Sequence, residues 1–320
     1  MCTCNGERFL AEQLGSIVAQ SRPPDELVVC DDASTDGTWT LLTTFASRAP
    51  FPVTLRRNDV RLGVVGNFSQ AMTLATGDAI ALADQDDVWL PGKLKKLEDA
   101  LLANPAAGFV FSDADLIDEH GLRLGSTLWP VLGVSQERQT DLKAGRAVDL
   151  LMAGSTVTGA TMMFRAVYRS AVLPIPADLW ILHDGWAALV MSALAPVALV
   201  SEPLMQYRQH AMQEIGLAGA SAGASVTDAS IAAGLARRNP YDRVISVLVR
   251  VLDRLEAIRD LPGRQRGMRY LRAGLTHMRA RAALPPRSAR RVALVVRELA
   301  SGRYHRFGRG VLSAAKDAFS

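Results

Sequence analysis

Three carboxylates lie within four residues, at Asp84, Asp86 and Asp87, directly after the short apolar run 79–83. Clustered carboxylates repel one another, so an ordered cluster needs a cation or hydrogen-bond donors. Mg²⁺ and similar hard ions are typically held by one or two carboxylates together with substrate phosphates. The cluster therefore predicts a site for a divalent metal and a diphosphate. For these three acids alone, a solvated turn that caps the next helix is an equal alternative.

Two further acidic segments follow apolar runs. Asp31 and Asp32 come after the run 27–30, and Asp113 and Asp115 end another such run. Ligands of open α/β sheets bind beyond the carboxyl ends of the strands. We therefore expect the three acidic segments to gather on one rim of a sheet, which favours the functional interpretation over the solvated turn.

The elements that must position these acids alternate along the chain. Apolar runs predict strands at 27–30, 53–56, 79–83, 108–112, 158–164 and 197–200. Helical spacing of apolar residues predicts helices at 9–18, 41–45, 68–75, 94–102, 165–173 and 187–194. This alternation predicts an α/β fold, with a mostly parallel central sheet flanked by helices. The glycine- and proline-broken stretch 116–148 is predicted to be an irregular loop over the site.

Composition narrows the class of protein. The chain has 320 residues, of which 49% are hydrophobic and 21% charged, as is typical of a globular protein with a large core and an appendage, or with two domains. Three cysteines without framework spacing argue against a disulfide scaffold and fit a reducing cytosol. No apolar run of 18 residues predicts a membrane span. A dinucleotide-binding oxidoreductase is disfavoured because no G-x-G-x-x-G follows the first strand.

Charge divides the chain unevenly. Residues 1–236 carry 16 Lys and Arg against 26 Asp and Glu, a net of −10, whereas residues 237–320 carry 20 against 6, a net of +14. We predict a working domain at 1–214, a Gly/Ala/Ser-rich linker or loop at 215–238 and a basic amphipathic helical extension at 239–320. The extension either packs on the main domain with a solvated basic face or contacts an anionic membrane surface, and both remain open. Nucleic acid is not an expected partner, because aromatic residues are sparse there and no recognition motif appears.

Six short segments identify a resemblance when taken together. They are TCNGERFL at 3–10, VCDDASTDGT at 29–38, TGD at 76–78, DQDDVWLP at 84–91, HDGW at 183–186 and YRQH at 207–210. In this order they resemble the family 2 glycosyltransferases of the GT-A fold, especially the rhamnosyltransferase-like branch of bacterial surface polysaccharide synthesis. The motifs cover residues 1–212 and are highly specific as a set, and the tail beyond them is not covered.

The resemblance implies roles for the acidic segments. Asp84 and Asp86 look like the family's DxD-type pair, in which Asp86 is the more direct ligand of Mg²⁺ or Mn²⁺ and Asp84 also faces the nucleotide sugar. Asp32, together with Asp31, resembles the acidic strand end that contacts the nucleotide base.

The resemblance also implies roles outside the acidic segments. Thr3 and Glu7 lie in the first nucleotide-binding loop, and Asp184 matches the general base, with a helix N-cap as its alternative. His210 sits where some members place a further metal or diphosphate contact, and a structural histidine paired with a carboxylate is an equal alternative. Arg208 is expected either to contact the diphosphate or to balance nearby acids.

Two departures from the family pattern concern the N-terminus. Cys4 stands where the family usually has tyrosine, so an aromatic contact to the base is in question. Only three residues precede Cys4, whereas the family has several apolar residues of a first strand before this loop. We therefore expect the natural start to lie upstream of Met1, or the chain to be truncated.

The function implied is that of a metal-dependent hexosyltransferase with inversion at the anomeric carbon. The first expected donor is dTDP-rhamnose, with hexose and galactofuranose donors open. The expected acceptor is a glycan, lipid-linked at the inner face of the cell membrane, which places the protein in the cytoplasm with peripheral membrane contact. The alternatives are a sugar-nucleotide hydrolase, a nucleotidyltransferase, or a catalytically silent glycan-binding protein on the same fold. Donor cleavage without acceptor would favour the hydrolase, and donor binding without turnover would favour the silent protein.

Overall fold

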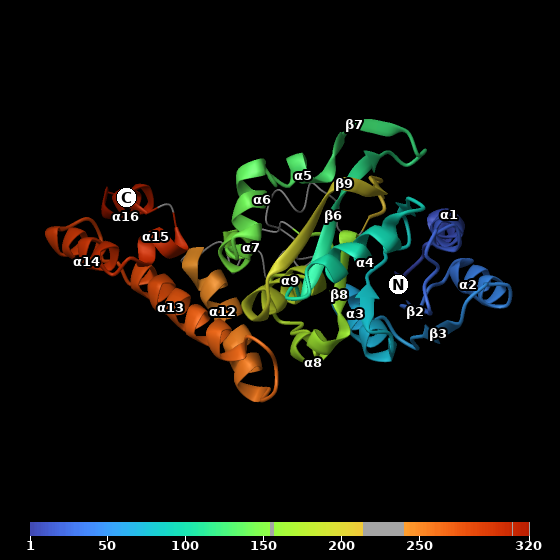
Figure 1. Ribbon diagram of the computed structural model, residues 1–320, viewed down its shortest axis with the longest axis horizontal. Coiled ribbons are helices and arrows are strands. Elements are labelled where there is room, and N and C mark those ends of the chain that lie inside the picture. Colours follow the sequence, from blue (N-terminus) through green and yellow to red (C-terminus); the bar gives the residue numbers. More distant parts are fainter. Residues whose placement is uncertain (154–156, 214–239, 309, 320) are drawn as a thin grey trace. The chain divides into compact units, whose positions relative to one another are not determined.

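The computed structural model describes residues 1–153, 157–213, 240–308 and 310–319 (Figure 1). The chain divides into two compact units, residues 1–225 (unit 1) and 226–320 (unit 2). The predicted linker, 215–238, lies outside the described residues.

Unit 1 alternates strands and helices as predicted. Its strands are β1 (Cys2–Thr3), β2 (Leu27–Asp31), β3 (Val53–Arg57), β4 (Ala79–Ala81), β5 (Val88–Trp89), β6 (Phe109–Ile117), β7 (Arg123–Thr127), β8 (Met162–Arg165) and β9 (Val197–Arg208). Its α-helices are α1 (Glu7–Val18), α2 (Thr38–Ala46), α3 (Gly63–Leu74), α4 (Lys93–Ala103), α5 (Leu128–Val131), α6 (Gln136–Lys143), α7 (Ala147–Ala153), α8 (Arg169–Val172) and α9 (His183–Leu194). Two 3₁₀ turns, η1 (Gly159–Thr161) and η2 (Ala166–Tyr168), flank β8.

The first sheet is parallel, in the order β1-β2-β3. All five residues of β2 are buried, as expected for an apolar strand that is covered on both faces. Thr3 pairs with Asp31 at the carboxyl ends of β1 and β2. The loops that follow these two strands therefore leave the sheet at the same edge.

Met1 continues the path of β1 towards its amino end. Its ammonium group donates a hydrogen bond to the Val28 carbonyl at 2.8 Å, and its own carbonyl accepts from the Cys30 amide at 3.1 Å. A cavity of about 460 Å³ next to Met1 is lined by residues of β2 and β4. The expectation of an upstream start stays a prediction.

The second sheet is mixed. Its order is β4-β8-β6-β9-β5, and β7 pairs with β6. β6 and β9 run side by side and parallel, and the other pairs of this sheet are antiparallel (Figure 1). The α/β class with flanking helices is thus as predicted. The antiparallel pairs were not predicted. An apolar run indicates that a strand is buried, but it does not indicate the direction of the strand relative to its neighbours.

The third acidic segment does not end a strand, and here the expected rim is wrong. β6 continues through Asp113 and Asp115 to Ile117. The Asp113 carboxylate accepts from the backbone amides of Ala114 and Trp129, at 2.8 and 2.9 Å, and Asp115 pairs with Arg123. These two acids support the local fold instead of joining the other two acidic segments.

The stretch 116–148 is regular, so its prediction as a loop is also wrong. It contains β7, α5 and α6 and the start of α7. Gly121, Gly133 and Gly145 have positive φ angles and lie in turns between these short elements, and Gly125, also with a positive φ, lies within β7. The glycines and prolines do interrupt regular structure, as predicted. The helices and strands between them are too short for their apolar residues to show a helical or strand period.

Unit 2 is helical, with α12 (Pro240–Ala257), α13 (Arg264–Ala282), α14 (Ala289–Ala300), α15 (Arg303–Phe307) and α16 (Val311–Phe319). The sequence predicted a helical extension over 239–320. Val295, Tyr304 and Ala314 form a buried cluster between the last three helices. Within the described residues of both units, no helix is long and apolar enough to cross a membrane.

Candidate functional site

An open cleft of about 840 Å³ lies beyond the carboxyl ends of β1, β2 and β4. Most of the predicted site residues line it, namely Thr3, Glu7, Asp32, Asp84, Asp86, Asp184 and His210. Asp31 and Arg208 do not line it. The cleft thus brings together residues from five separate segments of unit 1.

The loops after β1 and β2 interlock through tight turns. Asn5 and Ala33 adopt left-handed φ angles of 49° and 54°. The Asn5 amide donates to Ser34 Oγ at 2.9 Å, and the Thr35 amide donates to Asn5 Oδ1 at 2.8 Å. The Gly37 amide likewise donates to the carboxylate of Glu7 at 2.9 Å. One side of the cleft is therefore built from two loops that are held by their own polar groups.

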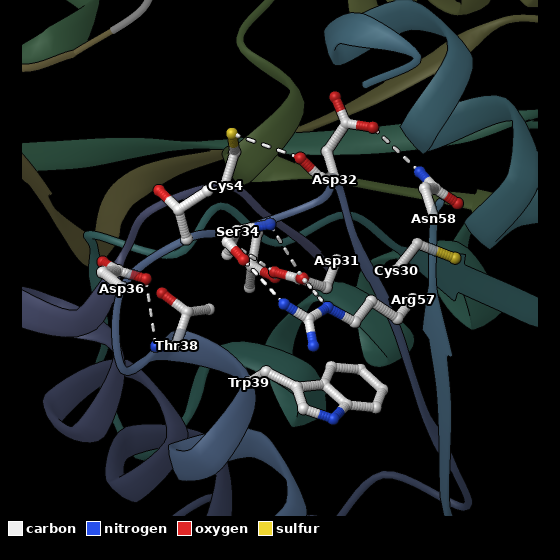
Figure 2. A network of polar contacts seen from close by, with 12 residues as sticks. Cys4, Cys30, Asp31, Asp32, Ser34, Asp36, Thr38, Trp39, Arg57 and Asn58 are labelled. Atoms are coloured by element: carbon white, nitrogen blue, oxygen red, sulfur yellow. Dashed lines mark hydrogen bonds and ion pairs between the residues drawn. The ribbon is translucent and has the colours of Figure 1, made fainter. Parts of the chain in front are cut away.

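Asp31 is fully buried at the centre of this network (Figure 2). Its Oδ1 accepts from the hydroxyls of Thr3, at 2.9 Å, and Ser34, and its Oδ2 accepts from the Ser34 amide at 3.1 Å. Arg57 Nε lies 3.6 Å from the same carboxylate. Asp31 therefore holds the loop in place, which is a different role from the expected contact with the base.

Asp32 lines the cleft, and its carboxylate accepts hydrogen bonds from backbone amides at the start of α3. Its Oδ1 accepts from Asn58 Nδ2 at 2.9 Å and from the Leu62 amide at 2.7 Å, and its Oδ2 accepts from the Gly63 amide at 2.9 Å. A carboxylate oxygen can accept two hydrogen bonds. Among the described residues only Gly63 donates to Oδ2, so that oxygen retains acceptor capacity for a ligand.

Gln85, which the sequence reasoning missed, clamps the acidic turn to the first loop. Its Oε1 accepts from the Cys4 amide at 2.8 Å, and its Nε2 donates to the Cys4 carbonyl at 3.1 Å. A Cβ at Gly6 would lie 2.2 Å from Gln85 Oε1, so any other residue at this position would displace the Gln85 amide from its present place. The only signal in the sequence was the position of Gln85 between two acids, because a neutral amide adds nothing to a charge pattern.

The acidic turn concentrates negative charge under partial burial. Burial, followed by the neighbouring carboxylates of Asp86 and Asp184, raises the pKa of Asp84 to about 7. Burial and the Asp86 charge also raise the pKa of Asp87. Lys93 is buried close by, and burial lowers the pKa of its amine to about 7. A bound cation would relieve the mutual repulsion of these carboxylates.

The predicted trio of metal ligands does not form a site made of protein groups alone. His210 Nε2 lies 2.9 Å from Asp86 Oδ2 in a direct side-chain contact. Among the described residues, no three His, Cys, Asp or Glu side chains are grouped so as to hold a metal. Asp84 and Asp86 still supply the hard oxygen donors that Mg²⁺ uses, and Mg²⁺ takes its remaining ligands from substrate phosphates and water. The residues fit an ion that is shared with a diphosphate.

Arg208 lies behind the acidic turn, with only 2% of its surface exposed. Its Nε donates to the Asp86 carbonyl at 2.8 Å, its backbone amide donates to Asp87 Oδ1 at 3.1 Å, and its Nη2 pairs with Glu12. The guanidinium also lies 4.7 Å from the centre of the Phe9 ring. Of its two expected roles, this geometry favours the balancing of nearby acids over contact with a diphosphate.

Arg61 lines the cleft and is exposed, although no motif drew attention to it. Arg8 also lines the cleft and forms a salt bridge of 2.6 Å with Glu119. Arg8 lies in the first turn of α1, within the TCNGERFL segment, and Arg61 lies in the loop before α3, where an isolated basic residue gives no sequence signal. Among the described residues that line the cleft, these are the arginines available to an anionic ligand.

Asp184 enters the cleft from the first turn of α9. Its Oδ2 accepts from the Gly159 amide at 3.0 Å, and its Oδ1 accepts from the Gly185 amide at 2.7 Å. The residue at the N-cap position is Leu182, so Asp184 is not the N-cap. Beside it, the His183 ring stacks on Phe68 with 3.8 Å between the ring centres. The carboxylate is thus held in one orientation, while each oxygen keeps a lone pair for another partner.

Comparison with known proteins places these features in a family. The sequence model described as glycosyl transferase family 2 matches residues 1–167. An uncharacterised glycosyltransferase of Nostoc sp. is 28% identical over 252 residues, which are 77% of this chain and 74% of that protein. The dTDP-rhamnosyl transferase RfbG of Shigella flexneri is 34% identical over 110 residues, 33% of this chain and 38% of that protein. The match therefore spans well under half of the Shigella protein.

A solved structure shows the same fold. Residues 1–349 of Staphylococcus aureus TarS, crystallised with UDP-GlcNAc, superpose with a TM-score of 0.58 at 16% identity, covering 99% of this chain and 86% of that chain. This likeness confirms the predicted GT-A fold. Because the family's sequence model matches more than half of the residues, this chain belongs to glycosyl transferase family 2.

Proposed function

We propose that the protein is an inverting, metal-dependent hexosyltransferase that moves a sugar from a nucleotide-diphosphate donor to a hydroxyl of a glycan acceptor. The observation that carries this proposal is the meeting of Asp84, Asp86 and Asp184 on one cleft, which the loop containing Thr3 and Glu7 also lines. One part of the cleft is suited to a diphosphate, and another offers a carboxylate to a hydroxyl.

The nucleotide would lie against the interlocked loops of the first sheet. Asp32 Oδ2 keeps acceptor capacity for an N–H of the base, and the loop from Thr3 to Glu7 would surround the nucleoside. Arg61 and Arg8 supply positive charge for the diphosphate, the task first expected of Arg208. Charge-assisted hydrogen bonds of this kind are about twice as strong as neutral ones.

Asp86 and Asp84 would hold the divalent ion, with Asp86 as the closer ligand. His210 orients the Asp86 carboxylate through its contact of 2.9 Å. When bound, Mg²⁺ or Mn²⁺ would neutralise the charge that develops on the departing nucleotide diphosphate. Arg208 keeps the turn in register through the Asp86 carbonyl.

Asp184 would take the proton of the acceptor hydroxyl. Two backbone amides hold the carboxylate, and a base must lie within hydrogen-bond reach of the proton it removes. The hydroxyl oxygen then attacks the anomeric carbon as the bond to the diphosphate oxygen breaks, in a single displacement without a covalent intermediate. One displacement inverts the anomeric configuration.

The proposed donor is dTDP-rhamnose, and the similarity to RfbG over 110 residues supports it. The proposed acceptor is a lipid-linked glycan of a bacterial surface polysaccharide. Such an acceptor would place the protein in the cytoplasm at the inner face of the cell membrane, in peripheral contact with anionic lipid. Competition between dTDP-rhamnose, UDP-hexoses and UDP-galactofuranose for the cleft tests the donor assignment.

A donor panel tests the function directly. Equilibrium binding of each nucleotide sugar is measured with Mg²⁺, with Mn²⁺ and with chelator, and products are followed with a lipid-linked glycan acceptor. We expect one donor to bind in a metal-dependent manner and to be consumed only with acceptor, giving a product of inverted configuration by NMR. Hydrolysis at the same rate without acceptor, binding without turnover for every acceptor, or a retained configuration would each contradict the proposal.

A further inference from the structure

Helix α14 has a second apolar stripe on its outer face. Its inner face packs Val295 and Leu299 into the cluster of unit 2. Its outer face exposes residues that recur at helical spacing, namely Ala289, Val292, Ala293, Val296 and Ala300. Arg290 and Arg297 are exposed along one border of this stripe. A helix that is apolar on both sides is not fully explained by its packing within unit 2.

Helix α16 repeats this arrangement. Ala314 and Ala318 face the same inner cluster as Val295 and Leu299. On the outer side, Leu312 and Phe319 are 72% and 73% exposed, Val311 is also exposed, and Lys316 lies at the border of the stripe. Arg291 of α14 donates to the Asp317 carbonyl of α16, which ties the two helices together (Figure 1).

Within the described part of unit 2, the exposure of large apolar side chains is confined to these two helices. The large exposed apolar side chains in the described part of unit 2 all belong to α14 and α16: Val292, Leu294, Val296, Val311, Leu312 and Phe319. α12 and α13 carry none among the described residues, although they are just as rich in arginine. Contiguous exposed apolar surface with a polar border marks a contact site for a protein or a membrane.

The charge of this surface has one sign. Between Arg287 and Phe319 the acidic residues are Glu298 and Asp317, and both are buried in ion pairs, with Arg303 and Arg281. The described basic side chains that remain exposed there are Arg287, Arg290, Arg297, Arg306 and Lys316. Over this segment, the exposed charge of the described residues is therefore entirely positive.

We propose that the outer faces of α14 and α16 form a docking surface for an anionic phospholipid bilayer. Bulky apolar residues bordered by arginine and lysine are the combination with which interfacial helices bind anionic lipid. A second copy of this surface would bring like charges together. Nucleic acid would match the arginines but leave the valine, leucine and phenylalanine side chains in water. The inference deepens the membrane contact included in the proposed function by assigning it to particular residues.

Vesicle co-sedimentation of the full chain tests the surface without requiring turnover, so that it can fail separately from the proposed glycosyl transfer. Vesicles of phosphatidylglycerol and phosphatidylcholine are compared with vesicles of phosphatidylcholine alone. We expect binding to the anionic vesicles, weakened when salt rises from about 0.1 M to about 1 M, because the Debye length falls from about 10 Å to about 3 Å. Leu312→Asp and Phe319→Asp should each weaken binding at least about tenfold, because each loses the burial of a large apolar side chain.

Matched controls distinguish binding through this surface from non-specific binding through any exposed apolar side chain. Val60 and Leu102 of unit 1 are 68% and 65% exposed, and Val60→Asp and Leu102→Asp should bind vesicles as the unsubstituted chain does. Equal loss in the controls, equal binding to neutral vesicles, or no binding at all would overturn the proposal. It would equally be overturned if Leu312→Asp abolished a concentration-dependent dimer in light scattering and left vesicle binding unchanged.

Discussion

Nε2 of His210 lies 2.9 Å from Oδ2 of Asp86, although the two residues are separated by most of unit 1 in sequence. The contact joins the end of β9 to the acidic turn. The Phe9 ring of α1 packs against the His210 ring, with 4.7 Å between ring centres, so the imidazole is held from both sides. The carboxylate of Asp86, the proposed metal ligand, is thus oriented by His210 after β9, and the His210 ring is supported by Phe9 of α1.

His210→Gln should lower the affinity for Mg²⁺ or Mn²⁺ by about 10- to 100-fold, the usual cost of losing a group that orients a metal ligand. Titration of donor binding with metal measures this, and a higher metal concentration should restore binding. His120→Gln, at an exposed histidine, is the matched control. Unchanged metal dependence in His210→Gln would show that the contact has only a structural role.

Gln85→Ala should raise the KM for the donor and lower the free energy of unfolding by about 1–3 kcal/mol, since two backbone groups of Cys4 lose their partner. Gln85→Glu keeps the acceptor for the Cys4 amide but loses the donor to its carbonyl, and it adds charge to the turn. We expect both variants to affect donor binding more than kcat. A loss confined to kcat would contradict the clamp between the two loops.

Arg208→Met should destabilise unit 1 by about 1–3 kcal/mol, because the Asp86 carbonyl loses the guanidinium that donates to it. The ion pair with Glu12 adds little, because that carboxylate is largely exposed, and Asp87 keeps its hydrogen bond from the backbone amide of residue 208. Urea unfolding measures the loss, with Arg8→Met as a control at an exposed ion pair. If Arg208→Met has normal stability and loses only donor binding, the result would support the other expected role, a contact of Arg208 with the diphosphate.

The predictable part of unit 1 is its buried periodic elements. Burial on one or both faces requires apolar residues at regular spacing. The sequence therefore predicts β2 from its apolar run, and α4 from the stripe of Leu94, Leu97 and Leu101. β9 was predicted to end at Val200 but continues to Arg208 through Glu202 and Pro203, where the pairing with β6 shifts register. Tertiary pairing, which leaves no local signal, sets that length.

The site was predictable where chemistry depends on charge and motif. Charge and motif pointed to Asp86 and Asp184, and both line the cleft, whereas their roles as metal ligand and base stay predictions. Gln85 was missed because hydrogen bonding to a distant backbone has no sequence pattern. Asp31 and Arg208 were expected to contact the nucleotide sugar, but both are buried beside the cleft and do not line it. The sequence does not tell which side chains of a motif are buried.

Acid should loosen unit 2 through Asp317. Burial opposes ionisation of this carboxyl, but hydrogen bonds from Arg281 and Tyr304 outweigh it and lower its pKa. The unfolded chain then binds the proton more readily, so the stabilisation is present above the ordinary value of about 3.9 and is lost as pH falls through the lowered pKa. Hydrogen exchange of α13 and α16 should accelerate in that acid range.

Asp317→Asn should remove most of this acid dependence and destabilise unit 2 at neutral pH by about 1.5–3 kcal/mol, the range for a hydrogen bond to a charged group. Asp260→Asn, at an exposed acid in the same unit, should leave both properties unchanged. An acid response that persists in Asp317→Asn would assign it to another carboxyl, with Glu298 the first to examine, since its pKa is also lowered.

The most direct test of the central claim is Asp184→Asn, with donor affinity and turnover measured side by side. The amide keeps the shape of the carboxylate but cannot accept the proton, and loss of a general base costs about 10²- to 10⁴-fold. We predict that donor affinity changes by less than about threefold, a free-energy change well under about 1.4 kcal/mol. Turnover should fall by about 10²- to 10⁴-fold. Sugar transfer at the normal rate by Asp184→Asn would contradict the account.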